Sequence, residues 1–328
     1  TSMGPSILRT ALACCGLRLG AALLLNEVSL NQGTHCSGWS GKVIIANGML
    51  IGFIVPAEAI LFTILSMTQE NEIMNAYTVI FDRLSHLGPG DAQMTRDLVE
   101  RLRSDLSPAP RVADFGCGVG ASTLVLAQCL PESRVLALDT HAPFIERLET
   151  AASNLGLGDR ISAVVGDMAS PPALDDIEGK FDLIWSESAI YNIGRTNAFA
   201  SWLPLLKPNG WLVFSDIVWQ SEPIARSEKV STFWTNEYPE MTIASGVVNE
   251  LTIAGFNALE PVLSDRKAWS NYYEPLRERL RVLNQQDDHP QALKTVIAEI
   301  EREIEIYDCT ENEVALAYFL AERDSIPE

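Results

Sequence analysis

The sequence has little histidine and little positive charge. Only four histidines occur among 328 residues, and none of the six cysteines forms a C-x-x-C pair or lies at metal-ligand spacing from a histidine, so we expect no metal site. Lys and Arg total 24 against 43 Asp and Glu, which gives a formal net charge of −19. A surface this acidic repels phosphate backbones, so we expect no nucleic-acid partner and a small-molecule substrate instead.

The cysteines also bear on the cellular compartment. They stand at positions 14, 15, 36, 117, 129 and 309. Unpaired cysteines inside expected strands and helices suit a reducing environment, so we expect the protein to be cytoplasmic.

Residues 1–69 differ from the rest of the chain in being strongly apolar. Within them, residues 43–67 form an apolar run long enough to span a bilayer, but Pro56 and Glu58 interrupt it. Residues 11–25 resemble the core of a signal peptide, yet no clean cleavage context follows. Three roles are open for these residues. They could be a membrane anchor, a helical layer packed on the main domain, or an extension that is not part of the functional protein. We favour a helical or dispensable extension over a membrane span.

Residues 70–328 alternate between helix-type and strand-type patterns. Residues 92–106 have the apolar period of an amphipathic helix, and seven strand-like segments follow. These segments are RVADF (111–115), RVLALD (134–139), ISAVVGD (161–167), FDLIWSE (181–187), GWLVFSDIVW (210–219), residues near 257–263, and VALAYFLAE (314–322). Short apolar strands separated by helices are typical of a parallel sheet buried between helical layers, so we expect one doubly wound α/β domain.

Residues 269–308 lie between the last two expected strands and have a helical pattern. Val296, Ile297, Ile300 and Ile304 recur at the spacing that places them on one helix face. We therefore expect a helical insertion that packs on the domain, either as a lid or as the surface of a homodimer.

The stretch VADFGCGVG places Asp114 and three glycines between an expected strand and an expected helix. Gly116, Gly118 and Gly120 let the backbone turn sharply and approach a ligand, and the helix N-terminus offers free N–H groups. Two cofactor classes use such a turn. One is a dinucleotide for hydride transfer, and the other is S-adenosylmethionine (SAM) for methyl transfer.

Three features distinguish these cofactors, whereas Asp139 fits the ribose of either one. Asp114 precedes the first glycine by two residues, where a carboxylate would repel a pyrophosphate but could face an ammonium group. Asp167 and Met168 end the third expected strand, where an acid and an apolar side chain could flank adenine. The stretch LLKPNGWLVFSD (205–216) supplies a helix end, a turn and the fifth strand.

Taken together, these motifs resemble those of class I SAM-dependent methyltransferases in order and spacing. The resemblance covers about residues 75–265. It implies a seven-stranded Rossmann-like sheet, SAM as cofactor, S-adenosylhomocysteine as product and no metal. It also implies a SAM site made of Asp114, Gly116, Gly118, Gly120, Asp139, Thr140, Asp167, Met168 and Ser186. The motif SESAIYNIG further resembles a bacterial subgroup that acts on small molecules, with Ser188 in place of a glycine.

Glu187 and Tyr191 are the expected catalytic residues. Glu187 ends the fourth strand, at the edge where open α/β sheets bind ligands, and could orient a substrate amine or accept its proton. The alternative is a carboxylate that only holds its loop together.

Aromatic side chains could form a cage for a cationic substrate, with core packing as the alternative. The expected substrate contacts are Glu187, Tyr191, Trp234, Trp269 and Tyr272.

The expected function is SAM-dependent methyl transfer to a small molecule by in-line displacement, in which alignment supplies much of the catalysis. An amino acid such as methionine, methylated on sulfur, is one candidate acceptor, and an amine is another. A non-catalytic SAM-binding regulator and an NAD-dependent oxidoreductase remain as alternatives. The sequence does not determine the acceptor, the oligomeric state or the role of residues 1–66.

Overall fold

The computed structural model describes residues 42–46, 49–53, 69, 71–171, 181–220, 223–286, 288–310 and 312–324. In the N-terminal extension it shows an antiparallel pair, β1 (Lys42–Ala46) and β2 (Met49–Phe53). The helical expectation is therefore wrong for these residues. Their β-branched side chains favour strands, and the sequence places Asn-Gly between them, which is a strong hairpin signal. The other residues expected to be helical in the extension lie outside the described residues.

Membrane crossing can be assessed only for the described part of the chain. No helix there is both long and apolar enough to span a bilayer. The apolar run at residues 43–67 is described only over β1 and β2, so the question of an anchor in the rest of it lies outside the described residues. The domain boundary near residue 70 also stays a prediction.

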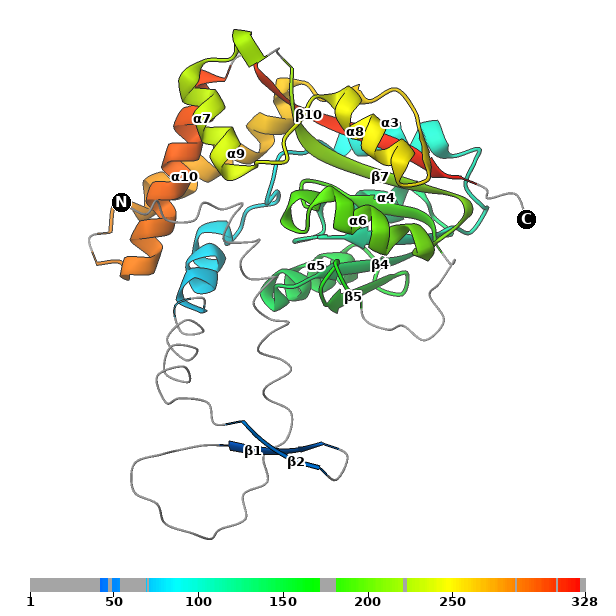
Figure 1. The fold of residues 1–328 in the computed structure, drawn as a ribbon, viewed down its shortest axis with the longest axis horizontal. Coiled ribbons are helices and arrows are strands. Elements are labelled where there is room, and N and C mark those ends of the chain that lie inside the picture. Colours follow the sequence, from blue (N-terminus) through cyan, green and yellow to red (C-terminus); the bar gives the residue numbers. More distant parts are fainter. Residues whose placement is uncertain are drawn as a thin grey trace.

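The main sheet has the strand order β5-β4-β3-β6-β7-β10-β8, with β9 beside β10 (Figure 1). Its strands are β3 (Arg111–Phe115), β4 (Arg134–Asp139), β5 (Ile161–Val165), β6 (Phe181–Ser186), β7 (Leu206–Trp219), β8 (Phe256–Ala258), β9 (Val262–Leu263) and β10 (Val314–Arg323). Strands β3 to β7 are parallel, whereas β10 is antiparallel to β7. The doubly wound α/β fold is confirmed. The expected sixth strand consists of two short strands, β8 and β9, because Pro261 cannot donate to a ladder.

The two faces of the sheet are covered by different helices. Successive side chains of a strand point to opposite faces. In β6, Leu183 and Trp185 pack with α3 (Ala92–Leu102) and α4 (Ala121–Cys129). Ile184 packs instead with α6 and α8. The remaining face helices are α5 (Ala142–Asn154), α6 (Arg195–Trp202) and α8 (Ala244–Ile253). The strands β3, β4 and β6 are thus buried from both sides, whereas β5, at the edge of the sheet, is only partly buried.

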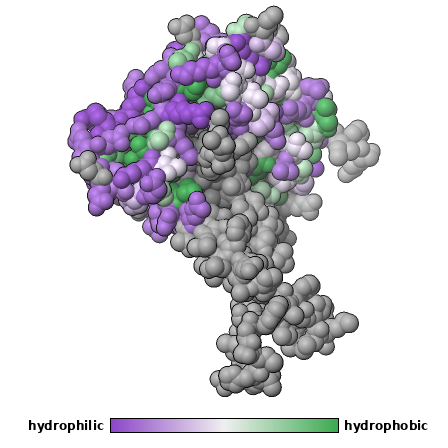
Figure 2. Space-filling view, turned by 60° about the vertical axis from the view of Figure 1, so that its left-hand side comes forward, coloured by the Kyte–Doolittle hydropathy of each residue, from purple (hydrophilic) through white to green (hydrophobic). Residues whose placement is uncertain are grey.

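A group of helices lies at the end of the sheet where the parallel strands finish (Figure 1). It consists of helical residues 71–81, α7 (Glu228–Glu237), α9 (Arg266–Leu283) and α10 (Gln291–Cys309), and we call it the helical cap. Helices α9 and α10 are the expected insertion between the last strands. The apolar stripe of α10 is buried, with α10 packed against α7 and α9. Figure 2, in which this side comes forward, shows a mostly hydrophilic outer face on the described residues.

Candidate active site

The glycine turn between β3 and α4 requires glycine on two grounds. Gly116, Gly118 and Gly120 all have left-handed φ angles, at 74°, 53° and 88°. A Cβ on Gly116 would also lie 2.4 Å from the Cβ of Ala189, and one on Gly120 would lie 2.2 Å from Cδ1 of Leu148. Gly120 is the N-cap of α4, so the turn presents the free N–H groups of that helix at the end of β3.

Asp139, at the end of β4, is bonded to this turn. Its Oδ2 accepts a hydrogen bond from the Gly118 N–H at 2.9 Å, and its Oδ1 accepts one from the His141 N–H at 2.9 Å. Burial raises the pKa of Asp139, although these bonds and one from the exposed Thr140 N–H act to lower it. A carboxylate oxygen has more than one acceptor site, so these bonds leave capacity for hydroxyl donors.

Asp114 is almost completely buried beneath the glycine turn, with 1% of its surface exposed. Its Oδ2 accepts a hydrogen bond from the Thr123 hydroxyl of α4 at 2.5 Å. Burial raises the pKa of Asp114 to about 7, and the negative charges of Glu187 and Asp139 contribute to the rise. Asp139 and Glu187 therefore both act on Asp114, and we call Asp114, Asp139 and Glu187 the acidic site.

Glu187 is held by hydroxyl groups from three separate elements. Its Oε2 accepts from Ser122 of α4 at 2.7 Å and from Thr95 of α3 at 3.3 Å, and its Oε1 accepts from Tyr318 of β10 at 3.0 Å. Burial raises its pKa, and hydrogen bonds from these hydroxyls act to lower it. The donors are side-chain hydroxyls, so Glu187 joins helices and a strand rather than only stabilising its own loop.

The acidic site has no cationic partner within the described part of the chain. None of the ion pairs there includes Asp114, Asp139 or Glu187. Buried negative charge without a counterion favours a cationic ligand and repels an anionic one. SAM carries a sulfonium and an ammonium group, whereas a dinucleotide carries a pyrophosphate. The acidic site therefore fits SAM better than NAD.

Residues 85–91 cross over the glycine turn and the end of β6. A Cβ on Gly118 would lie 3.0 Å from Cδ1 of Leu87, so this segment covers the turn closely. The Ser188 hydroxyl donates to the Pro89 carbonyl at 2.6 Å, and the Asn271 side chain of α9 donates to the Gly90 carbonyl at 2.9 Å. The segment therefore links the helical cap to the acidic site and can shield it from water.

The other expected cofactor residues have different surroundings. Met168 is buried, with its Sδ 3.3 Å from the position of a Cβ on Gly116, so it lies beside the turn. The carboxylate of Asp167 accepts from the Ala169 N–H two residues on at 2.8 Å, which closes a tight turn. Ser186 is buried and donates its hydroxyl to the Phe115 carbonyl at 2.9 Å. The structure thus brings Met168 to the turn but directs the Ser186 hydroxyl to the β3 backbone.

The expected substrate residues come together only in part. Tyr191 lies on η1 (Ile190–Asn192), and its ring meets the edge of the Tyr238 ring with centroids 6.2 Å apart. Trp234 and Tyr272 are buried in the same hydrophobic cluster as Tyr238. Trp269 belongs to this cluster as well, but it stacks on Tyr273 and Tyr307 within the cap, which is the core-packing alternative.

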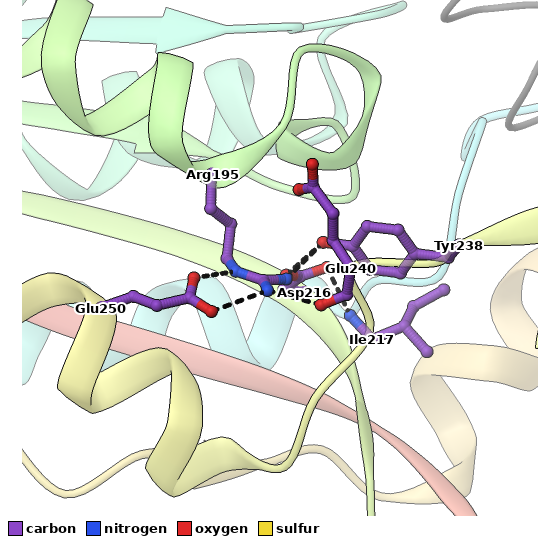
Figure 3. A network of polar contacts seen from close by, with 6 residues as sticks. All are labelled: Arg195, Asp216, Ile217, Tyr238, Glu240 and Glu250. Atoms are coloured by element: carbon purple, nitrogen blue, oxygen red, sulfur yellow. Dashed lines mark hydrogen bonds and ion pairs between the residues drawn. The ribbon is translucent and has the colours of Figure 1, made fainter. Parts of the chain in front are cut away.

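A buried arginine that the sequence analysis did not identify lies next to the SESAIYNIG motif. Arg195 donates to Asp216 at 2.8 Å, to the Tyr238 hydroxyl at 2.5 Å and to the Glu240 carbonyl at 2.6 Å (Figure 3). It also forms a two-point contact with Glu250, at 2.6 and 3.1 Å. The partners of Arg195 lie on β7, on α8 and among the residues that follow α7. Arg195 therefore holds Tyr238 in place beside the ring of Tyr191.

No group of His, Cys, Asp and Glu in the described residues could hold a metal ion.

Comparisons with known proteins agree with this geometry. Residues 112–210 match the methyltransferase domain family. The methyltransferase GfsG of Streptomyces halstedii is 33% identical over 133 residues, which cover 40% of this chain and 46% of that protein. Phosphoethanolamine N-methyltransferase 1 of Zea mays is 27% identical over 149 residues, covering 45% of this chain and 28% of that protein.

A solved structure shows the fold over most of the chain. The SAM-dependent methyltransferase of Geobacter sulfurreducens, in complex with S-adenosyl-L-homocysteine, superposes with a TM-score of 0.65 and 19% identity, covering 77% of this chain and 98% of that one. The chain therefore has the fold of SAM-dependent methyltransferases, and its residues 112–210 are similar to the methyltransferase domain family. It spans less than half the length of the two curated relatives described above.

Proposed function

We propose that this protein is a SAM-dependent methyltransferase that acts on a small molecule. The observation that carries the proposal is the acidic site beneath the glycine turn, in which Asp139 and Glu187 act on the buried Asp114 and no cation among the described residues is paired with them. The match of residues 112–210 to the methyltransferase domain and the solved methyltransferase of the same fold support it. NAD-dependent oxidation is disfavoured because a pyrophosphate would face this negative charge.

The residues that would hold SAM fit its chemistry. The glycine turn and the α4 N-terminus offer N–H donors, Asp139 offers carboxylate acceptors, and Met168 offers an apolar surface beside the turn. When bound, SAM supplies a methyl group activated by a sulfonium. The chain's own contribution is then alignment and exclusion of water, for which the covering residues 85–91 are placed.

We propose two candidate methyl acceptors, which are an amino acid such as methionine and an amine. A thioether needs no proton removed, whereas an ammonium group must lose one before it can attack. In the second case the chain must accept a proton, and Glu187 has the raised pKa that such a group requires. The plant phosphoethanolamine N-methyltransferase among the relatives supports an amine. A cytoplasmic location and a homodimer also belong to the proposal.

The test is methyl transfer from isotope-labelled SAM into a pool of methionine, primary amines and small carboxylic acids, followed by mass spectrometry. We expect one labelled product. Asp139→Ala should abolish transfer and S-adenosylhomocysteine binding, because Asp139 also organises the glycine turn. Asp159→Ala removes an exposed carboxylate from the loop before β5 and should change neither. Tight binding of S-adenosylhomocysteine without any labelled product would favour a SAM-binding regulator instead.

A further inference from the structure

We propose that the helical cap contains a binding site for a positively charged group of the acceptor, formed by Glu237 and Glu303 together with the aromatic rings of Tyr191 and Tyr272. The proposal rests on the methyltransferase function proposed above and names the chemical class of its acceptor, an organic cation such as an ammonium group.

The two carboxylates belong to helices that pack on each other. Glu237 is in the last turn of α7 and is 7% exposed, and Glu303 is near the middle of α10 and is 9% exposed. Their charges act on each other, because Glu237 contributes to the raised pKa of Glu303, which is about 7 and is due first to burial. The Tyr273 hydroxyl donates to Oε1 of Glu303 at 2.8 Å and fixes one side of that carboxylate.

Glu237 lacks such a partner on one of its oxygens. Among the described residues, its buried Oε2 has no hydrogen bond, and the same is true of the indole Nε1 of Trp234. These residues are three positions apart on α7 and therefore share a helix face. Buried polar atoms are normally satisfied, since leaving one unpaired costs about 1–3 kcal/mol. A ligand that brings an N–H donor to Glu237 would remove this cost.

The charge balance of the cap interior also favours a cation. Within the described residues, neither Glu237 nor Glu303 belongs to an ion pair with lysine or arginine. Glu299, on the same helix as Glu303, has its pKa raised to about 7 by burial and by the charge of Glu237. Buried carboxylates without counterions are held partly protonated, and a bound ammonium group would let them ionise.

The aromatic rings connect this charge to the acidic site. Burial raises the pKa of Tyr191 and of Tyr272, and the negative charge of Glu303 raises both further. Tyr272 is tilted against Tyr273 with centroids 4.8 Å apart. Tyr191 belongs to the η1 turn that follows Glu187, so the cluster begins where the parallel strands end. Aromatic faces attract cations, most strongly when water is excluded.

The experiment compares cations with neutral molecules of the same shape in the presence of saturating S-adenosylhomocysteine. The probes are choline against 3,3-dimethyl-1-butanol, and hexylamine against hexanol, titrated by calorimetry. In the wild type we expect each cation to bind about tenfold or more tightly than its neutral partner, given cation–π attraction in a desolvated site. Equal affinities within both pairs would overturn the proposal.

Charge-removing variants locate the site. Glu237→Gln and Glu303→Gln should each reduce the cation preference severalfold. Glu305→Gln removes the same charge from an exposed position of α10 and should leave the preference unchanged. Equal loss in Glu305→Gln, or no loss in the two buried variants, would show that the preference arises elsewhere and would overturn the proposal.

Two controls keep the results interpretable. Oε2 of Glu237 has no hydrogen bond among the described residues, whereas Glu303 accepts one from Tyr273, so Glu237→Gln remains informative even if Glu303→Gln disturbs folding. Affinity for S-adenosylhomocysteine is measured on every sample. If it binds while the cations show no preference, the cation site is refuted and the proposed function stands. If it does not bind the wild type, the proposed function itself fails.

Discussion

Gly116→Ala tests whether the glycine turn depends on close packing or only on backbone conformation. The φ angle of 74° costs a non-glycine residue roughly 1–2 kcal/mol. The new Cβ would also lie 2.4 Å from the Cβ of Ala189, an atom fixed to its own backbone that cannot rotate away. Overpacking of this kind adds about 1–3 kcal/mol. We therefore expect a loss of roughly 2–5 kcal/mol in the free energy of unfolding.

Gly156→Ala is the matched control for this prediction. Gly156 has a similar φ of 68°, but a Cβ there would meet nothing within 4 Å, so only the conformational cost applies. Urea unfolding of both variants, with and without S-adenosylhomocysteine, measures the difference. At a concentration 100 times its Kd, S-adenosylhomocysteine should stabilise Gly156→Ala by about 2.7 kcal/mol and Gly116→Ala hardly at all. Unfolding free energies that agree within about 0.5 kcal/mol, with equal ligand effects, would refute the steric argument.

Two further predictions concern buried charge. The pKa of Asp114 is about 7, and a cationic ligand favours its ionised form, so SAM affinity should fall as the pH drops from 8 to 6, by up to about tenfold. Asp114→Asn should remove this pH dependence in a calorimetric titration; a wild-type affinity that is constant over this range would contradict the reasoning. Arg195→Met should lower the free energy of unfolding by about 3–5 kcal/mol, because it leaves Asp216 buried without its cation. Adding Asp216→Asn should recover part of that loss in urea unfolding, and no recovery would show that Asp216 is not the cause.

The local pattern of apolar residues was sufficient to predict the central strands. The stretches RVADF and RVLALD form β3 and β4 over the residues expected from sequence. Their apolar runs are short, contain valine or leucine, and are followed by a turn, which leaves little choice of boundary. Strand β7 begins at Leu206 rather than at the expected Gly210, because Lys207, Pro208 and Asn209 belong to the strand that they were expected to precede.

The surroundings of the site residues could not be predicted in the same way. Glu187 was expected at the end of its strand, but its three hydroxyl donors lie 92, 65 and 131 residues away in sequence. Such contacts depend on how α3, α4 and β10 are placed by the fold, which no local periodicity encodes. The burial of Arg195 could not be predicted for the same reason. An arginine at this place in the sequence does not indicate which residues will surround it in the fold.

The position of β10 has a consequence for synthesis of the chain on the ribosome. This strand pairs with β7 over Val314 to Glu322 and separates it from β8, yet it is the last element of the sheet to be made. Until it emerges, the apolar β7 remains an edge with unpaired backbone groups, which invites pairing with other chains. Glu187 also lacks the Tyr318 hydroxyl until then. The nascent protein therefore passes through an aggregation-prone interval that ends in the same step that completes its acidic site.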